Sequence, residues 1–454
     1  MKKQSKIIFW PFLPIDYKAA QDFLTAMAQK GWMLKSIGRV FAKFEAIEAS
    51  NLIFSIDVYK HGGPLTPDNS KQAKEYRDFC EQFGWKYIAS RDYLQVFYAQ
   101  KSDYPTKLQT DEHIEQSILE QSLLKNEYVN IVAYVVLAYI SLRQLFPISY
   151  NNVLNYTSFM STLVLPVLFA IMIGSNLVTI YRVFQAKRRV KLGLSMKHRS
   201  LSQAKRASLI RNTPILFGVV LLMISYFYDS VVTSNIPMSF FYLPLSSVFI
   251  GVFIQYLVKK KSTDQRTSVM IVTIGIIATL VLTSFLVSVV SGQNLTVSDE
   301  HNQLLNQTLV ISASEIYQIK PNEKAKPHYV VQGSSPIIKQ YLIYSEIIES
   351  NNESLYLKVE YFNATSNKSA QWLFKEVFKS LKKGITYQGE LLYNTPLKYD
   401  DVLKEIWNVD QLAISSNDQS TIVLLKENRV VVIEATIDYK NPDIINLITK
   451  RLIN

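Results

Sequence analysis

The side chains that could carry nucleophilic, acid–base or metal chemistry are few and far apart in this sequence. Cys80 is the one cysteine, so the chain cannot form a cysteine-based metal cluster or an internal disulfide. It contains no glycine-rich phosphate loop and no HExxH pattern. The histidines show no metal-ligand spacing; they are His61, His113, His198, His301 and His328. We therefore expect no catalytic, cofactor-binding or metal-binding residues and no enzymatic activity.

Two pairs of adjacent carboxylates are the closest match to a general acid and base. They are Asp111-Glu112 and Asp400-Asp401. Each pair precedes a helical pattern, and negative charge is favoured at the start of a helix by the helix dipole. We interpret both pairs as solvated helix starts. A membrane enzyme, the alternative, would need a convergent polar pocket.

One pair of opposite charges lies in apolar surroundings. Arg143 and Asp229 stand near the ends of two long apolar stretches. Charges within membrane helices are often functional, and these two are candidates for an ion pair near the outer face of the membrane. The alternative is that each side chain extends separately to the membrane surface.

The elements that would hold these charges are long apolar stretches. A helix crosses the hydrocarbon core of a bilayer with roughly 20 apolar residues. Five stretches in this chain meet that requirement: Tyr128–Phe146, Tyr156–Tyr181, Pro214–Val232, Phe240–Val258 and Ser268–Val290. We therefore predict a five-helix transmembrane bundle over residues 128–291.

The basic residues predict the orientation of these helices, because loops rich in Lys and Arg remain in the cytosol. The connection 182–213 is rich in Lys and Arg and has no Asp or Glu, and the connection after the fourth stretch is also basic. The opposite connections, 147–155 and 233–237, have no Lys or Arg. The sequence predicts a multi-pass protein of the cell membrane with a cytoplasmic N-terminus and an extracellular C-terminus.

The formal net charge of +12 follows from the same loops. The regions before and after the membrane segments are near neutral, so the positive excess lies in the connections predicted to be cytoplasmic. Anionic lipid headgroups attract such loops. We therefore expect a lipid bilayer with anionic headgroups as a partner, and no nucleic acid.

The region before the membrane contains one pattern twice. Each copy has an amphipathic helix that ends at a glycine, Gly31 or Gly84, followed by a tryptophan, Trp32 or Trp85, and two short strands. Glycine readily adopts the left-handed conformation that ends many helices. We interpret the tryptophans as packing between helix and sheet, with ligand stacking as the alternative.

This repeat predicts a cytoplasmic α+β domain over residues 1–110, with two helices packed on one antiparallel sheet. The first copy carries an additional alternating strand over 52–59. The basic opening of the chain has no apolar run long enough for a signal peptide. Residues 111–127 are polar and helical, and they form a connector to the first membrane helix.

The region after the membrane, residues 292–454, is predicted to be a second, extracellular α+β domain. Strand-like runs cover 307–311, 340–348 and 355–362, and a helical face runs from Ala370 to Gly384. A hairpin over 421–437 follows. The last helix begins at Asn441-Pro442, which is a typical helix start.

Several segments of the N-terminal region carry a resemblance to a known family: Phe9–Phe12, Tyr17–Trp32, Ile56–Tyr59, Phe79–Trp85, Gln95–Tyr98 and Thr110–Glu112. With these segments the region resembles the bacterial family known as domain of unknown function 2812, DUF2812. The resemblance covers roughly the first 110 residues and implies a membrane protein of Gram-positive bacteria, similar to products encoded beside regulators of the PadR type. It implies no activity, cofactor or catalytic residue.

Two functions of different classes fit these observations. The first is a membrane-embedded sensor or regulatory protein, in which an outer domain meets a cue and an inner domain responds. The second is an accessory subunit of a membrane transport or envelope-stress system. Either function implies a protein partner or a homo-oligomer, and the sequence names none.

Overall fold

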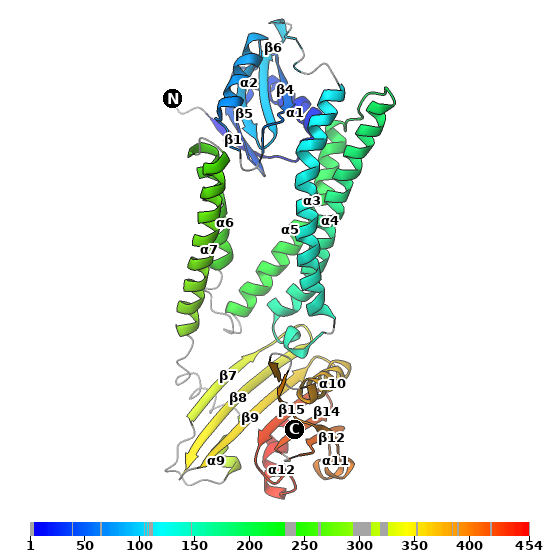
Figure 1. Cartoon of the computed structure of the whole chain (residues 1–454). Helices are drawn as coiled ribbons and strands as arrows, with labels where there is room; N and C mark the ends of the chain where they lie inside the picture. Colours follow the sequence, from blue (N-terminus) through cyan, green and yellow to red (C-terminus); the bar gives the residue numbers. More distant parts are fainter. Residues whose placement is uncertain are drawn as a thin grey trace. The chain divides into compact units, whose positions relative to one another are not determined.

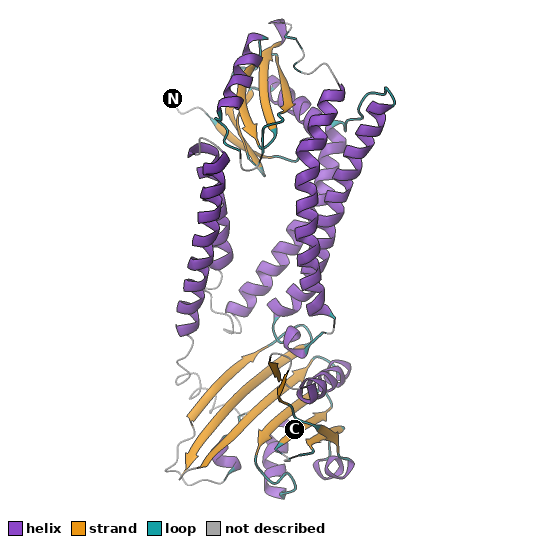
Figure 2. Ribbon diagram, viewed as in Figure 1, coloured by secondary structure: helices purple, strands orange, loops and turns teal. Residues whose placement is uncertain are grey.

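The computed structural model describes most of the chain between residues 4 and 453 (Figures 1 and 2). The residues outside the description are 1–3, 39, 64–65, 104, 107, 109–111, 147, 232–241, 262–264, 294–309, 318–325, 351–352, 384, 388–389, 418–419 and 454. The chain folds as two compact units. The first is Met1–Ile140, Leu165–Val219 and Pro244–Ser284, and the second is Ser141–Val164, Val220–Leu243 and Phe285–Asn454.

The N-terminal domain consists of two copies of a strand–helix–strand–strand unit. The first is β1 (Ser5–Phe9), a short 3-10 helix η1 (Pro14–Asp16), α1 (Tyr17–Gln29), β2 (Trp32–Ile37) and β3 (Phe41–Ala46). The second is β4 (Leu52–Val58), α2 (Lys71–Gln82), β5 (Lys86–Arg91) and β6 (Leu94–Gln100), followed by η2 (Lys101–Asp103).

The prediction of one antiparallel sheet is wrong, because each copy forms its own three-stranded sheet. The strand orders are β1-β3-β2 and β4-β6-β5. In each copy the opening strand pairs with the third strand, so the strand over 52–58 begins the second copy and does not belong to the first. A register shift lies between Leu34 and Ser36 in β2 and between Tyr87 and Ala89 in β5. The two copies therefore share even an irregularity of strand pairing, a β-bulge, at equivalent positions.

Both repeat glycines end a helix with a left-handed residue. Gly31 has a φ of +79° and Gly84 a φ of +84°. A Cβ atom on Gly31 would lie 2.9 Å from the carbonyl oxygen of Ile47. Helix α2 begins at Ser70, whose hydroxyl accepts the amide of Ala73 at 3.3 Å.

Long helices follow the N-terminal domain (Figure 1). Helix α3 (Glu112–Leu145) joins the predicted connector and the first apolar stretch in one helix. A short 3-10 helix, η3 (Tyr150–Val153), leads to α4 (Tyr156–Lys191) and α5 (Leu201–Val231). Two further helices are α6 (Tyr242–Lys261) and α7 (Gln265–Gln293).

Three of these helices, α3, α4 and α5, are long and apolar enough to cross a membrane, judged by length and composition. In α6 and α7 the described apolar stretches, Phe249–Lys259 and Arg266–Thr279, are shorter. The three long helices indicate a membrane protein. The fourth and fifth crossings and the inside–outside orientation stay predictions, and the predicted outer loop 233–237 lies outside the described residues.

The N-terminal domain shares a hydrophobic core with the long helices. Phe23 and Leu24 of α1 belong to the same buried cluster as Leu119 of α3 and Val183 and Val190 of α4. Burial of a large aliphatic or aromatic side chain contributes about 1.5–3 kcal/mol, so this shared core stabilises the packing of the domain against these parts of α3 and α4.

The C-terminal domain contains a seven-stranded antiparallel sheet with the order β12-β13-β14-β15-β9-β8-β7. A separate hairpin, β10-β11, lies outside it. The elements in chain order are α9 (Ala313–Ile316), β7 (Lys326–Gly333), β8 (Ile338–Ser350), β9 (Glu353–Ala364), α10 (Asn367–Lys383), β10 (Ile385–Tyr387), β11 (Glu390–Tyr393), β12 (Leu397–Tyr399), α11 (Asp401–Trp407), β13 (Gln411–Ser415), β14 (Thr421–Lys426), β15 (Arg429–Ala435), α12 (Pro442–Ile448) and a π-helical turn η5 (Thr449–Ile453).

The two faces of this sheet have separate cores. Helix α10 covers one face with Ala370, Leu373, Phe374 and Val377, the i, i+3, i+4, i+7 spacing of an amphipathic helix. The other face packs against α9, α11, α12 and η5. A second α+β domain is thereby confirmed, whereas its extracellular location stays a prediction.

The elements predicted for this domain agree with the structure to different degrees. The hairpin β14-β15 and the helix that begins after Asn441 are confirmed, and the Asn441 side chain accepts the amide of Asp443 at 2.9 Å. Only residues 310 and 311 of the strand predicted over 307–311 are described, and they are not in a strand. The predicted helix stop at Gly384 lies outside the described residues.

Candidate functional site

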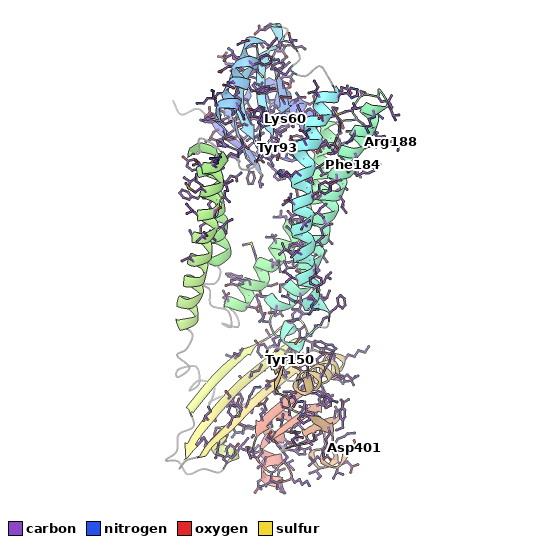
Figure 3. The ribbon with its side chains drawn as sticks, viewed as in Figure 1. Lys60, Tyr93, Tyr150, Phe184, Arg188 and Asp401 are labelled. Carbon is purple, nitrogen blue, oxygen red and sulfur yellow. The ribbon has the colours of Figure 1, made fainter. Side chains whose placement is uncertain are left out.

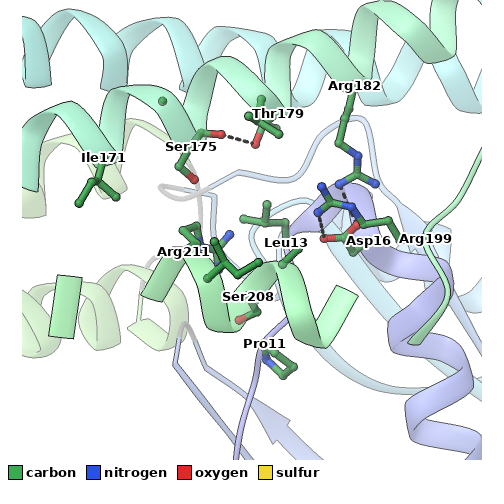
Figure 4. Close-up of a pocket in the computed structure, with 14 residues that line it drawn as sticks. Pro11, Leu13, Asp16, Ile171, Ser175, Thr179, Arg182, Arg199, Ser208 and Arg211 are labelled. Carbon is green, nitrogen blue, oxygen red and sulfur yellow. Dashed lines mark hydrogen bonds and ion pairs between the residues drawn. The ribbon is translucent and has the colours of Figure 1, made fainter. Parts of the chain in front are cut away.

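A buried carboxylate connects the N-terminal domain to the basic region between α4 and α5. Asp16 is the last residue of η1, and its Oδ1 lies 2.8 Å from Nη1 of Arg182 in α4. Its Oδ2 lies 3.8 Å from Nη1 of Arg199, in the connection between α4 and α5. Figure 4 shows both guanidinium groups turned toward the one carboxylate. A buried charge requires such partners.

Further polar contacts join the same elements around this pair. The Tyr17 hydroxyl donates a hydrogen bond to Glu115 of α3. The Lys187 ammonium of α4 lies 2.5 Å from Glu120 of α3. The Glu112 carboxylate accepts the backbone amide of Met196, 3.1 Å away. Carboxylates of the domain and of α3 therefore meet the basic connection at several points.

His198 belongs to the same contact. Its ring packs edge-on against Tyr17, with the centroids 5.3 Å apart. Burial lowers the pKa of His198, which favours the neutral ring. The histidine thus fills space beside the ion pairs without adding charge near neutral pH.

Next to Asp16 lies a partly open cavity of about 330 Å³, which we call the basic pocket. Its charged lining consists of Asp16, Arg182, Arg199 and Arg211, with Arg211 supplied by α5 (Figure 4). Three guanidinium groups therefore face one carboxylate. A volume of roughly 300–1,000 Å³ is typical of small-molecule sites.

The remaining lining of the basic pocket has two chemical characters. Ser175, Thr179 and Ser208 contribute hydroxyl groups. The other lining residues are apolar or glycine, and they come from the segment before η1 and from α4 and α5: Pro11, Leu13, Ile171, Gly174, Val178, Ala207 and Ile210. The pocket thus has a cationic, hydrogen-bonding end and an apolar wall.

The sequence predicted only part of this site. The sequence places the arginines in a basic connection, 182–213, that attracts anionic headgroups, but its patterns do not distinguish Asp16. Asp16 occupies the N-cap position of α1 yet makes no side-chain capping hydrogen bond there. An Asp before an amphipathic helix suggests a cap, and that local pattern hides its long-range role.

A second contact attaches the domain to α6. The Lys259 ammonium lies 3.0 Å from the carbonyl oxygen of Gly63 and 3.2 Å from that of Thr66. It also lies 3.6 Å from Asp68 and 3.8 Å from Asp92. The lysine side chain is largely buried, so the connection between β4 and α2 in the second copy receives a cation from the end of α6.

The second copy of the repeat contains a separate cavity of about 350 Å³ beside Asp57. The Tyr76 hydroxyl donates to the Asp57 carboxylate, and burial raises the pKa of Asp57. Burial also raises the pKa of the adjacent Cys80 thiol to about 11. Because the thiolate is the reactive form, this environment disfavours a nucleophilic cysteine.

The structure places the two residues of the predicted membrane ion pair in different environments. Asp229 is fully buried, and its oxygens accept the backbone amides of Tyr156 at 3.2 Å and Thr157 at 2.6 Å. It therefore caps the start of α4. Arg143 is exposed on α3. The Arg143–Asp229 ion pair itself stays a prediction.

The repeat tryptophans occupy unequal positions. Trp85 is buried with Cys80 and Phe97, and its indole N–H donates to the carbonyl of Thr106 at 2.7 Å. Trp32 is only partly buried, and the ammonium of Lys6 lies 5.6 Å from its ring. Within the described part of the chain, no group of three or more His, Cys, Asp or Glu residues has a geometry that could hold a metal ion.

Comparison with known proteins finds one relationship. No curated protein and no solved structure matches the chain. Residues 16–130, from Asp16 to the first part of α3, match the model of the family described as "Protein of unknown function (DUF2812)". This match over residues 16–130 supports the resemblance to the DUF2812 family that the sequence predicts.

Proposed function

We propose that this protein is a membrane-embedded regulatory protein, a sensor whose N-terminal domain responds in the cytosol to changes in the membrane helices or the C-terminal domain. The observation that carries the proposal is the buried ion pair between Asp16 and Arg182. It ties the DUF2812 domain to a helix that is long and apolar enough to cross a membrane.

Transmission requires an element whose state both ends of the protein can bias. Helix α4 supports this role because it packs into two cores. Its residue Val183 is buried in the core of the N-terminal domain, and Phe159, near its other end, packs against the core beneath α10. A shift of α4 would be felt in both cores, since packed interiors do not deform continuously.

A non-enzymatic role is supported by the chemistry of the described residues. Burial suppresses the thiolate of Cys80. The Asp229 carboxylate accepts two backbone amides at the start of α4. The arginines of the basic pocket are suited to holding an anion.

The test weakens the coupling and measures the response. Asp16→Asn removes the charge that Arg182 and Arg199 share, while it preserves the size of the side chain. The full-length protein and this variant are expressed in the native host, and co-purifying proteins and transcripts are compared. We expect Asp16→Asn to change the level of a specific partner or transcript.

The control variant is Asp78→Asn, because Asp78 is exposed on α2 and loses the same charge. It should behave like the wild type. If Asp16→Asn stays folded in the membrane yet alters neither partners nor transcripts, the regulatory proposal is wrong. Co-purification of a stoichiometric transporter, unaffected by Asp16→Asn, would instead support the accessory-subunit function.

A further inference from the structure

We propose that the basic pocket binds the headgroup of an anionic phospholipid, with the phosphate beside Arg211 and an acyl chain along the apolar wall of α4 and α5. This inference concerns binding alone and does not depend on the regulatory proposal.

The charges of the pocket favour an anion. Asp16 can neutralise one of the three guanidinium groups, and it is shared by Arg182 and Arg199. In the described part of the chain, Arg211 has no carboxylate within 4 Å, and its Nε donates to the side-chain oxygen of Asn212 at 3.0 Å. The charges of Asp16 and of Glu127 on α3 reach Arg211 only from a greater distance. A planar guanidinium with two terminal amines is well suited to a phosphate.

Hydroxyl groups beside the arginines complete a phosphate-binding end. Ser208 is buried, and its oxygen accepts the side-chain amide of Asn212 at 3.0 Å, so its O–H is oriented away from that donor. The Thr179 hydroxyl already donates its proton to the Ser175 backbone carbonyl at 3.2 Å, so the serines are the hydroxyl donors on which the site relies (Figure 4). Serine hydroxyls combined with arginines are common phosphate ligands.

The apolar wall favours a lipid over a free phosphate. Val178 and Ile210 line the pocket but are 50% and 66% exposed, so the apolar surface continues from the cavity onto the outside of α4 and α5. Gly174 also lines the pocket, and a Cβ atom there would meet nothing within 4 Å. Basic pockets between membrane helices at the cytoplasmic face bind anionic headgroups.

The exposed ends of these helices agree with this location. Phe184 and Arg188 lie one turn apart on α4, and both side chains are exposed (Figure 3). An aromatic ring beside a basic side chain is typical of a helix segment at the membrane–water interface. The basic pocket lies in the same part of α4, because the pocket residues Val178 and Arg182 precede Phe184 within about two helical turns.

The binding experiment uses the purified full-length protein in a neutral detergent. The protein is titrated with dioleoyl phosphatidylglycerol or with dioleoyl phosphatidylcholine, and native mass spectrometry counts the molecules that carry one lipid. We expect the anionic lipid to saturate the site at a concentration about tenfold lower than the zwitterionic lipid, which corresponds to the loss of one charge-assisted contact. Equal retention of the two lipids would overturn the proposal.

Two variants locate the site. Arg211→Gln removes the guanidinium outside the Asp16 pairs and should weaken phosphatidylglycerol binding about tenfold. Gly174→Leu places a side chain in the cavity without changing charge, and it improves the helix propensity of α4, so loss of binding there would not reflect unfolding. The matched control is Arg206→Gln, an exposed arginine of α5 outside the pocket lining, which should bind as the wild type does.

A third arm separates a lipid from a free anion. Inorganic phosphate, at the concentration at which phosphatidylglycerol saturates the site, should leave the thermal unfolding midpoint unchanged. Equal protection by inorganic phosphate would mean that the pocket binds the phosphate group alone, and the lipid assignment would fail. Unchanged lipid binding by both Arg211→Gln and Gly174→Leu would show that the lipid binds elsewhere.

Discussion

The Asp16 carboxylate lies 2.8 Å from the guanidinium of Arg182, and the side chain of Asp16 is only 3% exposed. The two residues come from the N-terminal domain and from a helix that can cross a membrane. Desolvation makes both charges expensive to bury alone, so each depends on the other. This pair is therefore a point at which a single substitution should weaken the attachment of the domain to the helices.

Replacement of Asp16 should destabilise the protein strongly. Removal of one partner of a buried ion pair typically costs about 3–5 kcal/mol, because the other charge remains buried without compensation. We expect Asp16→Asn and Arg182→Gln each to lower the thermal unfolding midpoint of the purified protein.

The double variant Asp16→Asn/Arg182→Gln distinguishes this pair from two independent contacts. If the charges interact, the double variant loses less stability than the two single variants together. Additive losses would contradict the assigned pairing. Asp78→Asn, which removes an exposed carboxylate, should leave the midpoint near that of the wild type.

The N-terminal fold was largely predictable, because its information is local. The helix that ends at Gly31 and the helix that ends at Gly84 are followed by strands at matching spacings. Glycine is favoured at a helix end because it readily adopts the left-handed backbone conformation. Strand β1 was not predictable, since Ser5–Phe9 becomes a strand only by pairing with β3. The separation into two sheets follows from the same pairing, which no local pattern encodes.

The candidate site was predictable only in its basic half. The arginines of the connection after α4 stand out as a block of like charge. Asp16 does not, because its partners Arg182 and Arg199 are distant in sequence and its local context suggests a helix cap. The cavity itself depends on how α4 and α5 pack, and the empty space beside Gly174 leaves no trace in the sequence.

The pH dependence of stability should contain a contribution from Asp57. Burial raises the pKa of its carboxyl above the value of an unfolded chain, although the Tyr76 hydroxyl opposes that shift. The folded state therefore favours protonated Asp57. The resulting stabilisation is complete below the unfolded pKa of about 3.9 and is lost as the pH rises through the higher folded pKa.

Asp57→Asn tests this assignment, because an amide stays neutral and can still accept the Tyr76 hydroxyl. The free energy of unfolding, measured from about pH 4 to pH 8, should fall less for Asp57→Asn than for the wild type, by about 1.4 kcal/mol for each unit by which the pKa is raised. Asp78→Asn should follow the wild-type profile. Parallel profiles for Asp57→Asn and the wild type would refute the assignment.

Close packing between α6 and α7 depends on Gly275. A Cβ atom at this position would lie 2.4 Å from Cδ1 and 2.7 Å from Cγ1 of Ile254. Small residues allow membrane helices to approach closely. We expect Gly275→Leu to lower the thermal unfolding midpoint, since overpacking typically costs about 1–3 kcal/mol.

Two companion variants show whether this effect arises from the contact. Gly251→Leu makes the same substitution in α6 where a Cβ atom meets nothing within 4 Å, so it should not destabilise the protein. Gly275→Leu combined with Ile254→Ala should recover part of the loss, because the shortened side chain makes room. Failure of this rescue, or equal loss from Gly251→Leu, would show that the helices do not meet at Gly275.

The orientation of the helices is a further prediction that experiment can decide. A reporter cleaved by external protease, placed after Asn454 or inserted beside Gly193 in the connection after α4, should be cut in intact protoplasts only at the first position. The reason is that Lys and Arg resist translocation, and the connection after α4 has them without Asp or Glu. Gly193 is a suitable insertion point because it has a φ of +69° and open space around it. Lysis should expose both reporters.

Two other outcomes would contradict the predicted orientation. Cleavage beside Gly193 in intact cells would place the basic pocket outside, where a headgroup of the cytoplasmic leaflet could not reach it. Protection of both reporters would mean an even number of crossings and a cytosolic C-terminal domain.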